Sequence, residues 1–148
     1  MDKNRDNDVK HLNSFLRGEI SAVETYNQAI KKLGSEPSIS SKLEGARNSH
    51  QQRVEVLREE ISRLGGEPAQ GSGVWGAFAR LTEGGAQVLG KQAAIAALEE
   101  GEDHGRDDYK RDIEDLSPEG RRLVQSKLLP EQLRTHDTLS QLKKQGQA

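Results

Sequence analysis

The sequence predicts an all-α protein built as a bundle of four long helices. Hydrophobic residues make up 32% of the 148 residues and charged residues 31%, a balance that suits narrow apolar seams between charged helices better than a β-sandwich. Apolar residues recur at intervals of three and four over nearly the whole length, without a competing strand-like alternation. At this length we expect a single domain over residues 1–148, with one core.

The first two helices are predicted from their apolar seams and from the residues at their ends. The first helix is expected over about residues 7–33 and is closed by Gly34. The second is expected over about residues 36–64, with a proline in its opening turn and Gly65-Gly66 after its end. Because the link between them is short, these helices are predicted to form an antiparallel hairpin.

The second half of the chain repeats this plan after a long connection. Residues 74–89 contain several glycines and are expected to form a short or bent connecting helix. The third core helix is predicted over about residues 91–116. The Ser-Pro-Glu sequence at 117–119 is a start signal for the fourth, expected over about residues 118–144 and kinked by Pro130. Two hairpins joined by a crossover give the order up-down-down-up.

A short motif occurs once in each half of the chain. It consists of a Gly-Glu pair followed, at helical spacings, by a tyrosine, an isoleucine and a leucine. The members of the two copies are Gly18, Glu19, Tyr26, Ile30 and Leu33, and Gly101, Glu102, Tyr109, Ile113 and Leu116. The spacings place the glutamate on the apolar face of its helix. A carboxylate in that position is costly unless something compensates its charge.

Each of the four predicted helices carries one glutamate or histidine near the middle of its seam. These residues are, in chain order, Glu19, His50, Glu102 and His136. Helix bundles build metal sites from such side chains on facing helices. The sequence therefore indicates these four residues as candidate ligands of a metal ion in the bundle core.

Two segments resemble the helix motifs of a known superfamily. Residues 16–19, with Tyr26 seven positions after the glutamate, resemble the first-helix motif of bacterioferritin-type proteins, and residues 98–104 with Tyr109 resemble the matching third-helix segment. Over residues 8–145 the chain is similar to ferritin-like proteins of the bacterioferritin and rubrerythrin type, and most resembles the uncharacterised bacterial ferritin-like domains of unknown function. The resemblance implies a ferritin-like bundle, a terminal iron ligand at the first glutamate, and a role in iron handling or stress protection.

The chain departs from the di-iron pattern on its second and fourth helices. That pattern needs a Glu-x-x-His motif on each of them, with the glutamates bridging the two metals. Three positions before His50 and His136 stand Arg47 and Leu133. Both bridging carboxylates are therefore absent, so efficient iron oxidation is not expected, and whether the chain is an enzyme stays open.

Two interpretations remain open for the four polar residues. They suit a single iron, zinc or manganese ion, which would make the chain a small metal-binding protein. Alternatively, Arg47 reaches toward Glu19 or Glu102 and supplies the positive charge, so that no metal is bound. The polar cluster is then a relic, and the chain is a non-catalytic helical interaction or dimerisation module.

Charge and composition exclude several other classes. A formal net charge of −2 gives no electrostatic footprint for nucleic acid or an anionic membrane. The absence of cysteine excludes disulfides, thiolate metal sites and cysteine nucleophiles. Neither a secretory signal nor a membrane-spanning segment is recognisable, so a cytoplasmic location is expected. We also expect a homo-oligomer, and Trp75 and Phe78 in the connection either cover the end of the core or form a subunit contact.

Overall fold

The computed structural model describes residues 3–33, 35–71 and 90–147, and this part of the chain is helical without any strand. Its four long helices are α1 (Lys3–Leu33), α2 (Pro37–Arg63), α5 (Lys91–Asp112) and α7 (Leu129–Gln147). The all-α prediction is confirmed. The connecting helix predicted over residues 74–89 lies outside the described residues.

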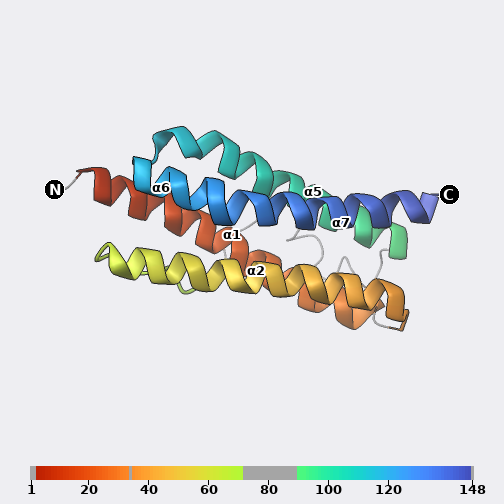
Figure 1. The fold of residues 1–148 in the computed structure, drawn as a ribbon. Coiled ribbons are helices and arrows are strands. Elements are labelled where there is room, and N and C mark those ends of the chain that lie inside the picture. The colour runs from red at the N-terminus through yellow and green to blue at the C-terminus, as the bar shows by residue number, and fades with distance from the viewer. Residues whose placement is uncertain (1–2, 34, 72–89, 148) are drawn as a thin grey trace.

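The helices form two antiparallel hairpins (Figure 1). In that view α1 and α7 run from left to right, whereas α2 and α5 run from right to left. α1 packs mainly against α2, and α5 packs mainly against α7. The two hairpins meet through α1 with α5 and through α2 with α7.

The fourth helix begins where the sequence predicts and is interrupted before Pro130. It starts as α6 (Pro118–Leu123), whose N-cap Ser117 accepts a hydrogen bond from the Gly120 amide at 3.2 Å. Asp8 of α1 holds this cap, since its carboxylate accepts from the Ser117 amide at 2.9 Å. A π-helical turn, η3 (Val124–Leu128), then leads into α7. The disturbance expected at Pro130 thus takes the form of a wider turn that keeps the chain helical.

α5 also ends in a tighter turn, the 3-10 helix η2 (Ile113–Asp115). Together α5 and η2 nearly cover the range 91–116 predicted for the third helix. At the end of α2, Gly65 has a φ of 83°, a left-handed conformation that favours glycine. The glycine signal after the second helix is therefore confirmed.

Two apolar clusters fill the bundle, and a polar layer lies between them. One cluster contains the buried apolar residues of α1 from Ala22 onward and those of α2 up to Ala46. The other contains the buried apolar residues of α1 up to Leu16 and those of α2 from Val54 onward. Ile20 and Val23 of α1 are partly buried and pack against this second cluster. α5 contributes to both clusters, whereas on the fourth helix α7 supplies buried residues to the first cluster and η3 supplies them to the second. Each helix therefore passes from one apolar cluster to the other through a short polar stretch.

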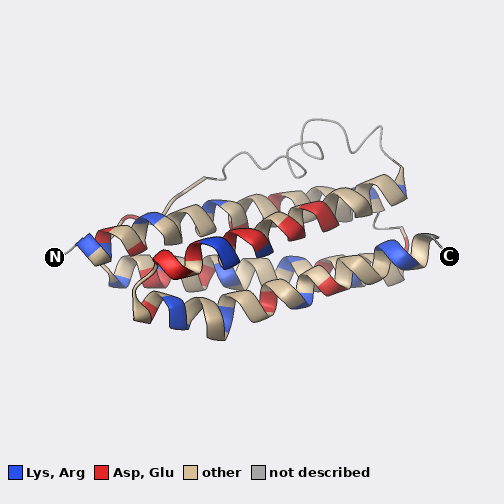
Figure 2. Cartoon of the chain, turned by 90° about the horizontal axis from the view of Figure 1, so that it is seen from above, with Lys and Arg blue, Asp and Glu red and all other residues tan. Residues whose placement is uncertain are grey.

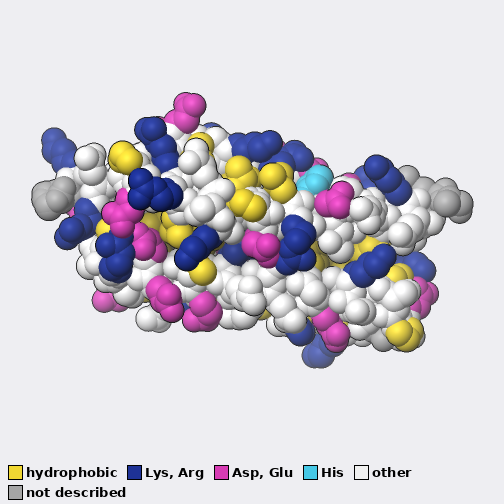
Figure 3. Space-filling view, in the orientation of Figure 1, with side chains coloured by type: hydrophobic (Ala, Val, Ile, Leu, Met, Phe, Trp, Pro, Cys, Tyr) yellow, Lys and Arg dark blue, Asp and Glu magenta, His cyan; other side chains and the backbone are white. Residues whose placement is uncertain are grey.

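The outer surface carries charges of both signs. Acidic residues follow α5 along much of its length (Figure 2), and on the face seen in Figure 3 acidic and basic side chains are interspersed. None of the described helices combines the length and the apolar character needed to cross a membrane.

Candidate functional site

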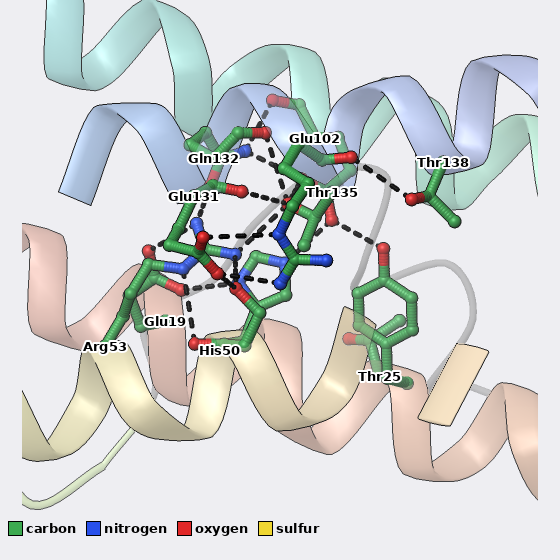
Figure 4. Close-up of polar contacts among 12 residues, drawn as sticks. Glu19, Thr25, His50, Arg53, Glu102, Glu131, Gln132, Thr135 and Thr138 are labelled. Carbon is green, nitrogen blue, oxygen red and sulfur yellow. Dashed lines mark hydrogen bonds and ion pairs between the residues drawn. The ribbon is translucent and has the colours of Figure 1, made fainter. Parts of the chain in front are cut away.

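The polar layer between the two apolar clusters is the candidate site (Figure 4). All four long helices contribute to it, and its side chains are between 0% and 5% exposed. Its members are Glu19 of α1, Ser49, His50 and Arg53 of α2, Glu102 of α5, and Gln132 and Thr135 of α7. We call these residues the polar cluster. Buried polar side chains of this kind need hydrogen-bond partners within the protein, because burial removes most of their contact with solvent.

His50 lies between the two glutamates. Its Nδ1 is 2.5 Å from Glu19 Oε1, and its Nε2 is 2.7 Å from Glu102 Oε2. Burial and the nearby Arg53 guanidinium lower the pKa of His50, but the two carboxylates outweigh them and the net shift is upward. These contacts favour the imidazolium form, which donates from both ring nitrogens.

Arg53 is the second buried cation of the cluster. Its Nη1 donates to Glu19 Oε2 at 3.3 Å and also to the side-chain oxygen of Gln132. Its Nη2 donates to Ser49 Oγ and to Thr135 Oγ1, both at 3.1 Å. Burial disfavours the charged guanidinium, yet Glu19 together with Glu102 and the two tyrosines outweighs that effect, and the pKa of Arg53 is raised.

The charges of the cluster balance. Burial raises the pKa of both glutamates, but Arg53 and His50 act in the opposite direction, and the pKa of Glu19 and that of Glu102 are both lowered. Two ionised carboxylates therefore face one guanidinium and one imidazolium. The cluster has no net charge, which is the condition under which buried ions are tolerated.

The tyrosines of the repeated motif bind each other's glutamates. Tyr109 donates to Glu19 Oε2 at 2.5 Å, and Tyr26 donates to Glu102 Oε2 at 2.5 Å. Burial and the adjacent carboxylate raise the pKa of both phenols well above the ordinary value. Both tyrosines are therefore neutral donors. The contacts form a continuous chain of five side chains, with His50 at its centre.

α7 completes the environment of Glu102. The Gln132 side-chain amide donates to Glu102 Oε1 at 2.8 Å, and Thr135 Oγ1 donates to the same oxygen at 2.7 Å. With His50 and Tyr26 on Oε2, this carboxylate accepts four hydrogen bonds, about its full capacity. Within the described part of the chain, every buried side-chain nitrogen and oxygen has a hydrogen-bond partner.

The structure brings together three of the four predicted site residues. Glu19, His50 and Glu102 meet in the cluster, whereas His136 Nε2 lies 2.5 Å from Asp103 Oδ1 at the edge of the bundle. Positions 135 and 136 precede Leu139 by four and three residues, so helical spacing allows either to face inward. In the structure Thr135 is fully buried, and His136 remains 19% exposed.

The compensating cation is Arg53, so the expectation that Arg47 reaches a buried glutamate is wrong. Arg47 lies near the surface, where its Nη1 donates to Asn27 Oδ1 at 3.2 Å. Arg53 follows His50 by three positions and therefore lies on the same face of α2. That spacing, together with the neighbouring seam residue Val54, was the available signal for Arg53.

On both α2 and α7, two buried polar residues of the cluster stand three positions apart. This is the spacing of the ligand pairs in a two-metal carboxylate bundle, but the residue types differ. A two-metal carboxylate bundle uses Glu-x-x-His on these helices. The corresponding inward pairs are His50-x-x-Arg53 on α2 and Gln132-x-x-Thr135 on α7. Among the described residues, no group of three or more His, Cys, Asp or Glu side chains is arranged to hold a metal ion.

A small cavity between α1 and α5 reaches the polar cluster at Glu19, His50 and Gln132, and Tyr109 also lines it. Its volume is about 20 Å³, which is room for about one water molecule. Small residues from the two helices form much of its wall, namely Gly18, Ala22, Gly101 and Gly105. A Cβ added at Gly105 would lie 2.7 Å from the Gln132 side-chain nitrogen, so α5 and α7 approach closely there. The cavity is too small for an organic substrate.

The reciprocal tyrosine contacts predict matched effects of two substitutions. Tyr26→Phe and Tyr109→Phe each remove one donor from a buried carboxylate, which is expected to lower the free energy of unfolding by about 1–3 kcal/mol. Urea denaturation followed by circular dichroism measures both. A variant as stable as the unchanged protein would contradict the contact that its tyrosine makes.

Comparison with known proteins gives one assignment. No curated protein and no solved structure matches the chain. A family model described as Domain of unknown function matches residues 7–115. The matched segment contains Glu19, His50, Arg53 and Glu102, and it ends before the fourth helix. Since the match covers most of its length, the chain belongs to this family, Domain of unknown function (DUF2383).

Proposed function

We propose that the chain is a ferritin-like bundle of the up-down-down-up type that needs no core metal and acts as a non-catalytic helical interaction module. The directions of the four long helices in Figure 1 support the arrangement. So does the position of the polar cluster, to which every long helix contributes at one level. The cavity beside the polar cluster is too small for an organic substrate, so the proposed interactions involve the outer surface of the bundle.

The charge balance of the cluster is the observation that carries this proposal. In a carboxylate bundle, bound metal ions offset the buried glutamates. In this chain Arg53 and His50 offset Glu19 and Glu102. A metal ion placed among them would face a guanidinium and would have to displace the protons that His50 donates. The side chains therefore do not fit a core metal while Arg53 stays in place.

The residue types at the inward positions support the same conclusion. The inward pairs His50-x-x-Arg53 and Gln132-x-x-Thr135 have the three-residue spacing of the Glu-x-x-His motif, but neither pair contains a carboxylate. A guanidinium does not bind metal cations, and amide and hydroxyl oxygens are weak substitutes for a carboxylate. Iron handling and stress protection through a di-iron centre are thus not part of the proposal.

A second candidate function is binding of a single iron, zinc or manganese ion. The observation that favours it is the convergence of Glu19, His50 and Glu102 within 2.7 Å contacts in a layer closed to solvent. Carboxylate and imidazole together suit these ions. In this case the Arg53 side chain would have to leave the cluster, and His136 would not take part.

Metal content distinguishes the two candidates. Protein from cells supplied with iron, zinc and manganese is expected to retain fewer than about one ion per ten chains after dialysis, because the cluster is neutral without metal. Its urea unfolding midpoint should be the same with and without a chelator. One tightly held ion per chain, together with a lower midpoint in chelator, would overturn the metal-independent proposal and favour the second. Self-association and a cytoplasmic location stay predictions from the sequence.

A further inference from the structure

We infer that Arg53 is the residue that keeps divalent cations out of this core, and that replacing it with histidine creates a site for one ion of the zinc class. This inference rests on the proposed metal-independent core and goes further by naming the residue responsible. It follows from where the guanidinium lies, from what it neutralises and from what surrounds it.

The guanidinium lies where a metal ion would have to be. Arg53 Nη1 contacts Glu19 Oε2 at 3.3 Å, and the other oxygen of the same carboxylate is 2.5 Å from His50 Nδ1. Arg53 is one helical turn beyond His50 on the same face of α2. A histidine at position 53 is shorter than arginine, so its ring would enter the space that the guanidinium leaves.

Arg53 is held too firmly for a metal to displace it in the unchanged protein. Its side chain is 2% exposed and donates to Glu19, Gln132, Ser49 and Thr135. A metal ion that took over Glu19 would strand this cation inside the bundle, and stranding a buried charge is strongly unfavourable. The planar guanidinium donates several hydrogen bonds in fixed directions, and neither a lysine ammonium group nor a hydrated metal ion reproduces that arrangement.

The charge balance permits one divalent ion once the arginine is gone. Arg53→His removes the guanidinium charge, and metal binding removes the extra proton of His50. A divalent cation replaces both positive charges, so the cluster is neutral again. Glu19, His50 Nδ1 and the introduced imidazole then offer three ligands that suit tetrahedral zinc or cobalt with a water molecule as the fourth, while Glu102 accepts from the other ring nitrogen of His50. Because His50 must release a proton, binding should weaken as the pH is lowered.

Cobalt binding tests the inference with a spectroscopic readout. The unchanged protein, Arg53→His, Arg53→Gln and the surface control Arg47→His are titrated with Co²⁺ after chelator treatment. Arg53→His is expected to bind about one ion per chain with the strong visible absorption of tetrahedral Co²⁺, and Zn²⁺ should displace it. Arg53→Gln, which removes the cation without adding a ligand, is expected to bind one ion more weakly. The unchanged protein and Arg47→His should bind none.

The outcomes separate the inference from the proposed function. Co²⁺ binding by the unchanged protein would overturn the metal-independent core itself. If neither the unchanged protein nor folded Arg53→Gln and Arg53→His binds Co²⁺, the proposed function stands and the role given to Arg53 is wrong. If Arg53→His unfolds without metal, circular dichroism with added Zn²⁺ is the second measurement, since binding to the folded form should restore its helix content.

Discussion

Replacing Arg53 with methionine is expected to lower the free energy of unfolding by about 3–5 kcal/mol. Methionine retains an unbranched apolar side chain but removes the charge and every donor of the guanidinium. Glu19 then lacks its second cation although it is only 5% exposed, and the Gln132 side-chain oxygen loses its donor. Urea denaturation in chelator, followed by circular dichroism, measures the loss.

Arg47→Met is the matched control for this substitution. Arg47 lies on the same helix and donates to Asn27 near the surface, so its replacement is expected to change stability by less than about 0.5 kcal/mol. Equal losses in the two variants would mean that the buried charge of Arg53 has no special role.

Adding Glu19→Gln to Arg53→Met isolates the contribution of the charge. If the loss comes from an uncompensated carboxylate, the double variant should be more stable than Arg53→Met alone, because the stranded charge is removed. If the loss comes only from packing, Glu19→Gln should cost the same stability in both backgrounds. A positive coupling would show that Arg53 acts as the internal counterion on which the proposed function depends.

The fold was predictable because its local signals agree with one another. Ser117 caps α6 as its position before a proline and a glutamate indicated. Glu19 and Glu102 were predictable as site residues because a carboxylate within an apolar seam is conspicuous. His50 was found in the same way. In each case the sequence pattern alone identifies the face of the helix.

The tyrosine contacts follow from the repeat once the helix directions are known. Within one copy the tyrosine follows the glutamate by seven residues, about 10 Å along a helix, so it lies too far away to bond its own glutamate. α1 and α5 are antiparallel, and therefore the same spacing places each tyrosine opposite the glutamate of the other copy (Figure 1). The sequence supplied the spacing, but the partner depended on the tertiary arrangement.

Arg53, Gln132 and Thr135 could not be recognised from periodicity alone. An arginine at the edge of a seam often extends its charge to solvent, so the spacing of Arg53 from His50 does not by itself decide that its guanidinium points inward. On α7, helical spacing does not distinguish position 135 from position 136, and the metal-ligand chemistry of histidine favoured the wrong one. Only the packing of α7 against α5 places Gln132 and Thr135 on Glu102.

The stability that the polar cluster provides is expected to decline above about pH 6.5. Burial and Arg53 lower the pKa of His50, but the glutamates raise it above its ordinary value of 6.5. The contribution of the imidazolium is therefore fully present below pH 6.5 and is lost as the pH rises through the folded-state pKa. The slope should approach about 1.4 kcal/mol per pH unit for the single proton released.

The glutamates set the acid limit of the same window. Burial raises their pKa, but the neighbouring cations lower it below the ordinary value of 4.5. Their contribution is present above pH 4.5 and is lost as the pH falls through the lowered values. The cluster should therefore contribute most between these limits.

Urea denaturation from pH 5 to pH 9, on the unchanged protein and on His50→Gln, tests the alkaline limb. Glutamine does not titrate, so the variant should be less stable at pH 6 and should lose the decline that His50 causes above it. His136→Gln is the matched control, since it leaves His50 and its two glutamates in place and should retain the decline. A decline that persists in His50→Gln would assign it to groups outside the cluster. If the decline disappears in His50→Gln and persists in His136→Gln, the protonated form of His50 between Glu19 and Glu102 stabilises the metal-independent core.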